Sequence, residues 1–145
     1  VINKDDIIFS AGQSIFSYNL NNGKMNWEQD LSSIGTPIID GKNIFSVTEN
    51  GYFVIMNKDT GKIISSNNIL KILKRKKRVT KITGFILGSG KIYSVTLNGY
   101  LIVSSAVSGK VEFFKKIGDP IVSSPIINNG KLFILTKNSR IVGLN

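Results

Sequence analysis

A run of positive side chains in the middle of the chain offers the clearest binding chemistry. Seven of the eleven residues from Lys71 to Lys81 are Lys or Arg and none is acidic, so this run supplies +7 of the net charge of +10. Such a density of charge attracts anionic lipid head groups, an acidic protein surface or nucleic acid. The candidate residues for contact with a protein partner or a membrane surface are Lys71, Lys74, Arg75, Lys76, Lys77, Arg78 and Lys81.

The same run also has a plainer interpretation. Seven like charges repel one another, so the segment is also typical of a solvated loop in a lysine-rich sequence. Nucleic acid is not expected as a partner, because no aromatic platform for base stacking accompanies the lysines. The apolar residues at the start of the segment, between Asn68 and Arg75, favour a helical turn or two that rests partly against the rest of the fold.

Residues suited to catalysis or metal binding are sparse. The 145 residues include no Cys and no His, which excludes cysteine nucleophiles, thiolate zinc sites, disulfides and the commonest general base. Thr48 and Thr96 are interpreted as strand residues, since no base is available to activate them. The aspartates are scattered and lie mostly at expected turns. We therefore expect no catalytic residue, no metal site and no cofactor.

The elements that position these residues form an internal repeat. Residues 44–62 and 92–110 align without a gap at an offset of 48, and nine aligned positions are identical, including Asn50-Gly51 with Asn98-Gly99 and Gly61-Lys62 with Gly109-Lys110. Weaker copies begin at Ile7 and Leu132. Self-similarity at roughly 40–50 residues is the signature of a repeat architecture.

Each repeat predicts four short strands. Asn-Gly between two β-branched and aromatic runs indicates a hairpin, and a second turn ending in Gly-Lys leads to a further strand. A short apolar strand precedes each hairpin, as in 36–40, 84–88 and 124–128. Because several strands are apolar on both faces, both faces must be covered, as in radially stacked sheets. The predicted fold is all-β, a β-propeller of four-stranded antiparallel blades. An irregular β-sandwich is the alternative.

Counting strands gives about fourteen, or three and a half blades, approximately at residues 1–34, 35–82, 83–122 and 123–145. The first sheet is expected to lack its inner strand and the last its outer strand. We therefore expect an open piece of a larger, eight-bladed propeller. It is either the C-terminal part of a longer chain or a natural half that pairs with another copy. With its end strands unpaired, the chain alone is expected either to self-associate through the open blade edges or to form an open arc.

The turn into the last strand of the first repeat resembles a known family. Residues 17–27 resemble the pyrroloquinoline-quinone (PQQ)-type propeller repeat, whose consensus is A-x-D-x-x-T-G-x-x-x-W: Gly23 and Trp27 match it, and Ser17 and Asn19 stand at its alanine and aspartate positions. The third copy has Phe113 at the tryptophan position, and the second has a serine. In that family the tryptophan docks between neighbouring blades. The resemblance therefore implies inter-blade packing for Trp27 and Phe113.

Within that superfamily the degenerate motif and the ending SSPIINNGKLFILTKNSRIVGLN resemble the outer-membrane assembly lipoprotein BamB. The resemblance implies a non-enzymatic scaffold on the periplasmic side of the outer membrane. Its implied partner is BamA, the central subunit of the barrel-assembly machinery. A fragment of a PQQ-dependent dehydrogenase, or a generic ligand-binding propeller, is the alternative. The quinone and calcium ligands of the dehydrogenases have no matching constellation in this sequence.

Overall fold

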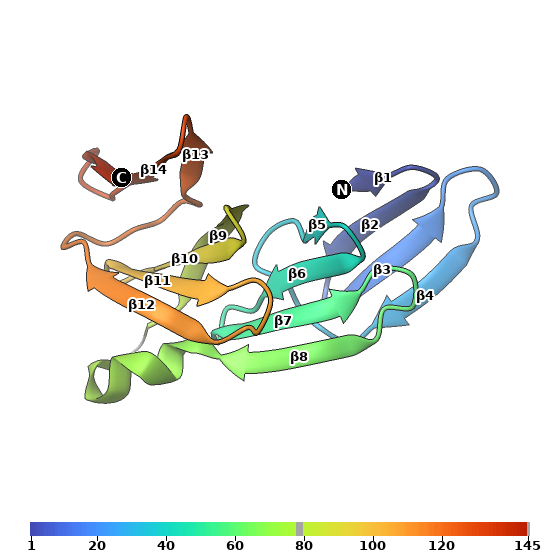
Figure 1. Ribbon diagram of the computed structural model, residues 1–145, viewed down its shortest axis with the longest axis horizontal. Coiled ribbons are helices and arrows are strands. Elements are labelled where there is room, and N and C mark those ends of the chain that lie inside the picture. The colour runs from blue at the N-terminus through green and yellow to red at the C-terminus, as the bar shows by residue number, and fades with distance from the viewer. Residues whose placement is uncertain (78–79, 145) are drawn as a thin grey trace.

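The computed structural model describes residues 1–77 and 80–144, with the backbone alone for residues 74–77. It consists of four antiparallel sheets, of which three have four strands and the last has three. The sheets follow one another in chain order along an open arc, with the N-terminal sheet at one end and the C-terminal sheet at the other (Figure 1). This arrangement confirms open propeller blades and excludes the β-sandwich.

Within each sheet, neighbouring strands are consecutive in the chain. The first sheet comprises β1 (Ile2–Asn3), β2 (Asp6–Ala11), β3 (Ser14–Asn19) and β4 (Met25–Gln29). The second comprises β5 (Ile38–Asp40), β6 (Asn43–Val47), β7 (Tyr52–Asn57) and β8 (Ile63–Asn68). The third comprises β9 (Ile82–Gly88), β10 (Lys91–Thr96), β11 (Tyr100–Ser105) and β12 (Val111–Lys116), and the last comprises β13 (Ile126–Asn128), β14 (Lys131–Leu135) and β15 (Ile141–Leu144). One 3₁₀ helix, η1 (Ile69–Lys77), joins β8 to β9.

The prediction that the first sheet lacks its inner strand is wrong, because β1 forms that strand. Ile2 and Asn3 form β1 and pair with Ile7 and Asp6 of β2. Lys4 makes the tight turn between them with a φ of +52°. A two-residue strand next to charged turn residues has no apolar run of its own, which is why the sequence did not predict it. Within the described residues, the last sheet ends at β15 without a fourth strand, as expected.

The hairpin turns explain why threonine recurs before Asn-Gly. The Tyr52 backbone N–H donates to Thr48 Oγ1 at 3.0 Å, and the Tyr100 N–H donates to Thr96 Oγ1 at 2.9 Å. In the last sheet the Arg140 N–H donates to Thr136 Oγ1 at 3.3 Å. These threonine side chains close the hairpin turns, which gives them a structural role in place of a chemical one.

The second turn of each repeat is closed by the residue at the aspartate position of the PQQ-type motif. Asn57 Oδ1 accepts hydrogen bonds from the backbone N–H groups of Asp59 and Thr60, both at 3.0 Å. Asn19 and Ser105 accept equivalent bonds in the first and third sheets. Asn and Ser therefore replace Asp without loss of the turn, since each offers a side-chain oxygen to the backbone.

The core lies between the sheets, in three apolar layers. The layer between the first two sheets is built on Ile8, Ile15, Trp27, Ile44, Val54 and Met56. The next contains Phe45, Val47, Phe53 and Ile55 on one side and Ile92 and Ile102 on the other, with Ile69, Leu70 and Leu73 of η1. The third layer is built on Val95, Leu101, Val103, Leu132 and Ile134. Each inner sheet therefore buries both of its faces, as its two-sided apolar strands predict.

We expect Gly51→Ala to destabilise the chain by about 3 kcal/mol, because it combines backbone strain with a clash. Gly51 has a φ of +83°, and an added Cβ would lie 2.3 Å from Leu70 Cγ. Gly41→Ala is the matched control, since Gly41 has a φ of +58° but no atom within 4 Å of an added Cβ. Urea unfolding should show a loss of only about 1 kcal/mol for this control. Equal losses in the two variants would contradict the role of the Leu70 contact.

Candidate functional site

The helix η1 carries the positively charged run and is anchored in the core. Ile69, Leu70 and Leu73 are buried, with exposed fractions of 0%, 7% and 2%. The Ile69 N–H donates to Gly51 O at 2.8 Å, and the Leu70 N–H donates to Asn68 Oδ1 at 3.1 Å. The short helix predicted from the sequence is therefore confirmed, and it is part of the layer between the second and third sheets.

The structure places only two of the seven predicted contact residues. Lys71 is exposed on η1. Lys81 Nζ lies 2.8 Å from Glu49 Oε1, and both side chains are about half exposed. This ion pair joins the end of the basic segment to the hairpin turn beside η1. The side chains of Lys74, Arg75, Lys76 and Lys77, and all of Arg78, lie outside the described residues, so their role as a contact surface stays a prediction.

Trp27 lies between the first and second sheets. Its Nε1 donates to Lys58 O at 2.9 Å, and its ring covers Gly61, where an added Cβ would lie 2.6 Å from the indole. At the next boundary the smaller pair Ser65 and Asn67 covers Gly109 in the same way. The turn glycine of one sheet is therefore the surface on which the last strand of the preceding sheet rests.

Phe113, at the tryptophan position of the third sheet, is 51% exposed. The following sheet ends at β15, before the turn that carries the glycine in the other sheets. Trp27 and Phe113 thus occupy equivalent positions in the repeat but have different surroundings. The difference arises from the neighbouring sheet and was not visible in the repeat motif itself.

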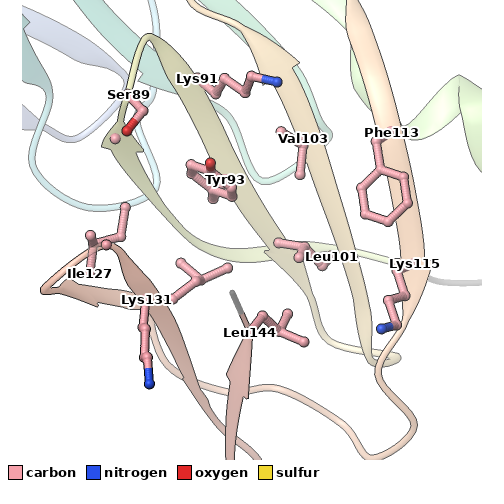
Figure 2. Close-up of a pocket in the computed structure, with 13 residues that line it drawn as sticks. Ser89, Lys91, Tyr93, Leu101, Val103, Phe113, Lys115, Ile127, Lys131 and Leu144 are labelled. Atoms are coloured by element: carbon pink, nitrogen blue, oxygen red, sulfur yellow. The ribbon is translucent and has the colours of Figure 1, made fainter.

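A pocket of about 350 Å³ lies beside Phe113, between the third and last sheets. Figure 2 shows Tyr93, Leu101 and Leu144 around its apolar floor and the amines of Lys91, Lys115 and Lys131 at its rim. Lys91 Nζ lies 2.9 Å from Glu112 Oε2, and this hydrogen bond raises the pKa of the Lys91 amine. Sequence reasoning missed this pocket, because no motif marks a space that two sheets create between them.

The described part of the chain contains no group of three or more His, Cys, Asp or Glu side chains that could hold a metal ion. None of its helices has the length and apolar character needed to cross a membrane.

Comparison with known proteins agrees with this architecture. The sequence profile of the family described as "Outer membrane protein assembly factor BamB" matches residues 1–67. BamB from Moraxella catarrhalis superposes with a TM-score of 0.74 at 15% identity, over 99% of this chain and 46% of that one. The computationally designed Ika4 protein superposes with a TM-score of 0.77 at 11% identity, over 99% of this chain and 86% of that one.

These findings define a β-propeller built from PQQ-type repeats. More particularly, the chain resembles BamB, in sequence over residues 1–67 and in fold over nearly its whole length. It spans less than half the length of the BamB chain it matches. No curated protein matches the sequence.

Removing the Trp27 side chain should cost far more stability than removing the Phe113 side chain. We expect Trp27→Ala to lose about 3–5 kcal/mol, since it empties a buried inter-sheet site and leaves Lys58 O without its donor. Phe113→Ala should lose about 1 kcal/mol or less, because half of that ring is already in contact with solvent. Urea unfolding followed by circular dichroism measures both variants. A small loss for Trp27→Ala would contradict its role in joining the sheets.

Proposed function

We propose that this chain is a non-enzymatic propeller scaffold of the machinery that assembles β-barrel proteins into the outer membrane. The observation that carries the proposal is the BamB family match over residues 1–67, together with the BamB fold across the rest of the chain. A scaffold needs stable surfaces more than reactive groups. The side chains assigned above fit that need, since the recurrent Thr, Asn and Gly residues close turns and Trp27 joins sheets.

The proposed partner is BamA, the central barrel-assembly subunit, and the proposed compartment is the periplasmic side of the outer membrane. Contact would be made by loops and strand edges at the surface of the propeller. The basic segment that begins at Lys71 is a second contact surface within this proposal. Its base is fixed by the buried residues of η1, so its charge would be held beside the junction of the second and third sheets.

We expect the chain to co-purify with BamA of its source organism and to bind the isolated periplasmic domains of BamA in biolayer interferometry. The control is an unrelated propeller of similar size and charge. Failure to bind BamA, with the fold intact by circular dichroism, would contradict the proposed function.

Reversing the charge of Arg75, Lys76, Lys77 and Arg78 to Glu should weaken binding to vesicles that contain anionic lipid by at least 100-fold at low salt. Each charge near such a surface contributes about 1 kcal/mol. The matched control reverses four exposed lysines elsewhere, Lys4, Lys24, Lys42 and Lys62, and thus changes the net charge equally. If both variants lose the same affinity, or neither does, the basic segment is not a contact surface. BamA binding is measured on the same variants, which separates a lipid contact from a protein contact.

A second candidate, a fragment of a quinone-dependent dehydrogenase, is favoured by one structural match. Quinohemoprotein alcohol dehydrogenase from Comamonas testosteroni superposes with a TM-score of 0.68 at 17% identity, over 80% of this chain and 20% of that one. Titration of PQQ and calcium into the protein separates the candidates. The scaffold proposal expects no change in the quinone absorbance spectrum, whereas saturable binding would favour the enzyme.

A further inference from the structure

Tyr52 and Tyr100 occupy the same position in the repeat, but their rings have different surroundings. Each begins the third strand of its sheet, and each backbone N–H donates to the threonine hydroxyl of the preceding Asn-Gly turn. Tyr100 is 7% exposed, whereas Tyr52 is 44% exposed. The third sheet therefore shows what covers a tyrosine at a position where the second sheet leaves it open.

A lysine of the neighbouring strand covers Tyr100. Lys116 pairs with Tyr100 across β11 and β12, and its amine lies 4.5 Å from the centre of the Tyr100 ring. The same amine donates a hydrogen bond to Asn98 O in the hairpin turn. A cation over an aromatic face is attracted by the negative potential of the ring. Tyr100 is thus one half of a cation–π pair within the chain.

The second sheet keeps the hydrogen bond to the turn but replaces the cation. Asn68 pairs with Tyr52 at the position of Lys116, and its Nδ2 donates to Asn50 O at 3.4 Å. An asparagine amide is uncharged and shorter than a lysine side chain, so it reproduces the turn contact and not the contact with the ring. Tyr52 therefore keeps an exposed aromatic face where the next sheet binds an amine.

The Tyr52 ring borders a hollow of about 570 Å³ between the first and second sheets, which we call the Tyr52 pocket. Among the described residues that line it, Asp30 is the one with a charged side chain. A carboxylate and an aromatic ring therefore border the same space, in a chain whose net charge is +10. The other lining residues are Gln13, Leu31, Ser32, Thr48 and Asn50.

The connections between the sheets explain why this space is open. At the next boundary Tyr100 belongs to one apolar layer with Ile69, Leu70 and Leu73 of η1. The connection between the first two sheets, residues 30–37, is fully described and contains no helix. Both sheets that border the Tyr52 pocket have all four strands. The pocket is therefore a feature of the junction between two complete sheets.

We propose that the Tyr52 pocket binds a cationic side chain, Lys or Arg, of a protein partner. The cation would lie over the Tyr52 ring as Lys116 lies over Tyr100, and Asp30 would supply the carboxylate that balances its charge. The side chains of Gln13 and Asn50 can exchange hydrogen bonds with the peptide groups that flank the cation. The proposal does not depend on the function in barrel assembly.

A protein segment fits the Tyr52 pocket better than a small ion. The lining offers one carboxylate, whereas a calcium ion takes six to eight oxygen ligands. A volume of about 570 Å³ lies within the range of sites that enclose organic ligands. The Tyr52 backbone is fixed by its 3.0 Å hydrogen bond to Thr48 Oγ1, so the ring is already positioned before the partner binds.

Titration of the ¹⁵N-labelled chain with the peptide acetyl-Gly-Gly-Arg-Gly-Gly-amide tests the proposal by NMR. Saturable shifts are expected at the amides of Gln13, residues 30–32 and residues 48–52. The matched peptide with citrulline, an uncharged isostere of arginine, should bind about 10-fold more weakly. Equal binding of the two peptides, shifts confined to other parts of the chain, or no binding would overturn the proposal.

Two other occupants are separated by the same titration. Butylguanidinium should bind about 10-fold more weakly than the arginine peptide, because it lacks the flanking peptide groups. Binding as tight as that of the peptide would assign the site to a free organic cation and overturn the protein partner. Peptide binding that appears only after Arg75, Lys76, Lys77 and Arg78 are changed to Glu would show that the chain's own basic segment fills the pocket, which would also overturn the proposal.

Substitutions in the pocket separate the ring from the carboxylate. Tyr52→Leu should weaken binding of the arginine peptide about 5-fold, whereas Tyr52→Phe should keep it, since the aromatic face remains. Asp30→Asn should also weaken it about 5-fold, and it retains an acceptor for the Ser14 hydroxyl. Asp40→Asn, at an exposed position outside the pocket, is the control for the change in net charge and should bind normally. Loss of binding in Tyr52→Phe, or equal losses in the two aspartate variants, would contradict the proposed roles.

A last substitution transfers the lysine of the third sheet to the second. Asn68→Lys should place the chain's own amine over Tyr52 and weaken peptide binding at least about 10-fold. Asn68→Ala, which loses the same amide hydrogen bonds without adding a cation, should still bind. Circular dichroism checks that both variants are folded. Full binding by Asn68→Lys, or equal losses in the two variants, would overturn the proposal.

Discussion

The structure depends on one constraint, which is that each inner sheet is apolar on both faces and must be covered twice. In the second sheet Ile44 and Met56 point toward the first sheet, while Phe45 and Phe53 point toward the third. No single sheet of this kind is stable in water, since burying one face leaves the other exposed. Sheets therefore have to stack in sequence, and the stack ends only where its ends are covered or closed on themselves.

Close approach between sheets adds a second, more local requirement. Strand β4 can rest on the second sheet only because Gly61 leaves room for the Trp27 ring. The glycine of the Asn-Gly turn leaves room in the same way for the segment that connects one sheet to the next. Gly51 accommodates the Leu70 side chain, and Gly99 lies against the backbone of Gly118 and Asp119. The two turn motifs that recur in the sequence thus mark two places where neighbouring segments approach too closely for a side chain.

Much of the fold was predictable because the residues that make these contacts recur at equivalent positions in the repeats. The Asn-Gly and Gly-Lys turns placed the hairpins, and their spacing gave the four-stranded sheets. The two residues of β1 were missed, because pairing of so short a strand depends on the neighbouring strand and the positive φ at Lys4. The surroundings of Phe113 and the pocket beside it were not predictable, since they depend on how two sheets face each other and on where the last sheet ends.

The insertion between the second and third sheets shows how a repeat can carry a particular surface without losing its packing. Ile69, Leu70 and Leu73 enter the same layer as the strands, so the first residues of η1 are part of the core, while Lys71 among them is exposed. The Leu70 contact uses the glycine that every Asn-Gly hairpin already provides. The ion pair of Lys81 with Glu49 brings the chain back to that same hairpin. The described residues on both sides of the basic segment, Leu70 and Lys81, are therefore tied to one hairpin turn.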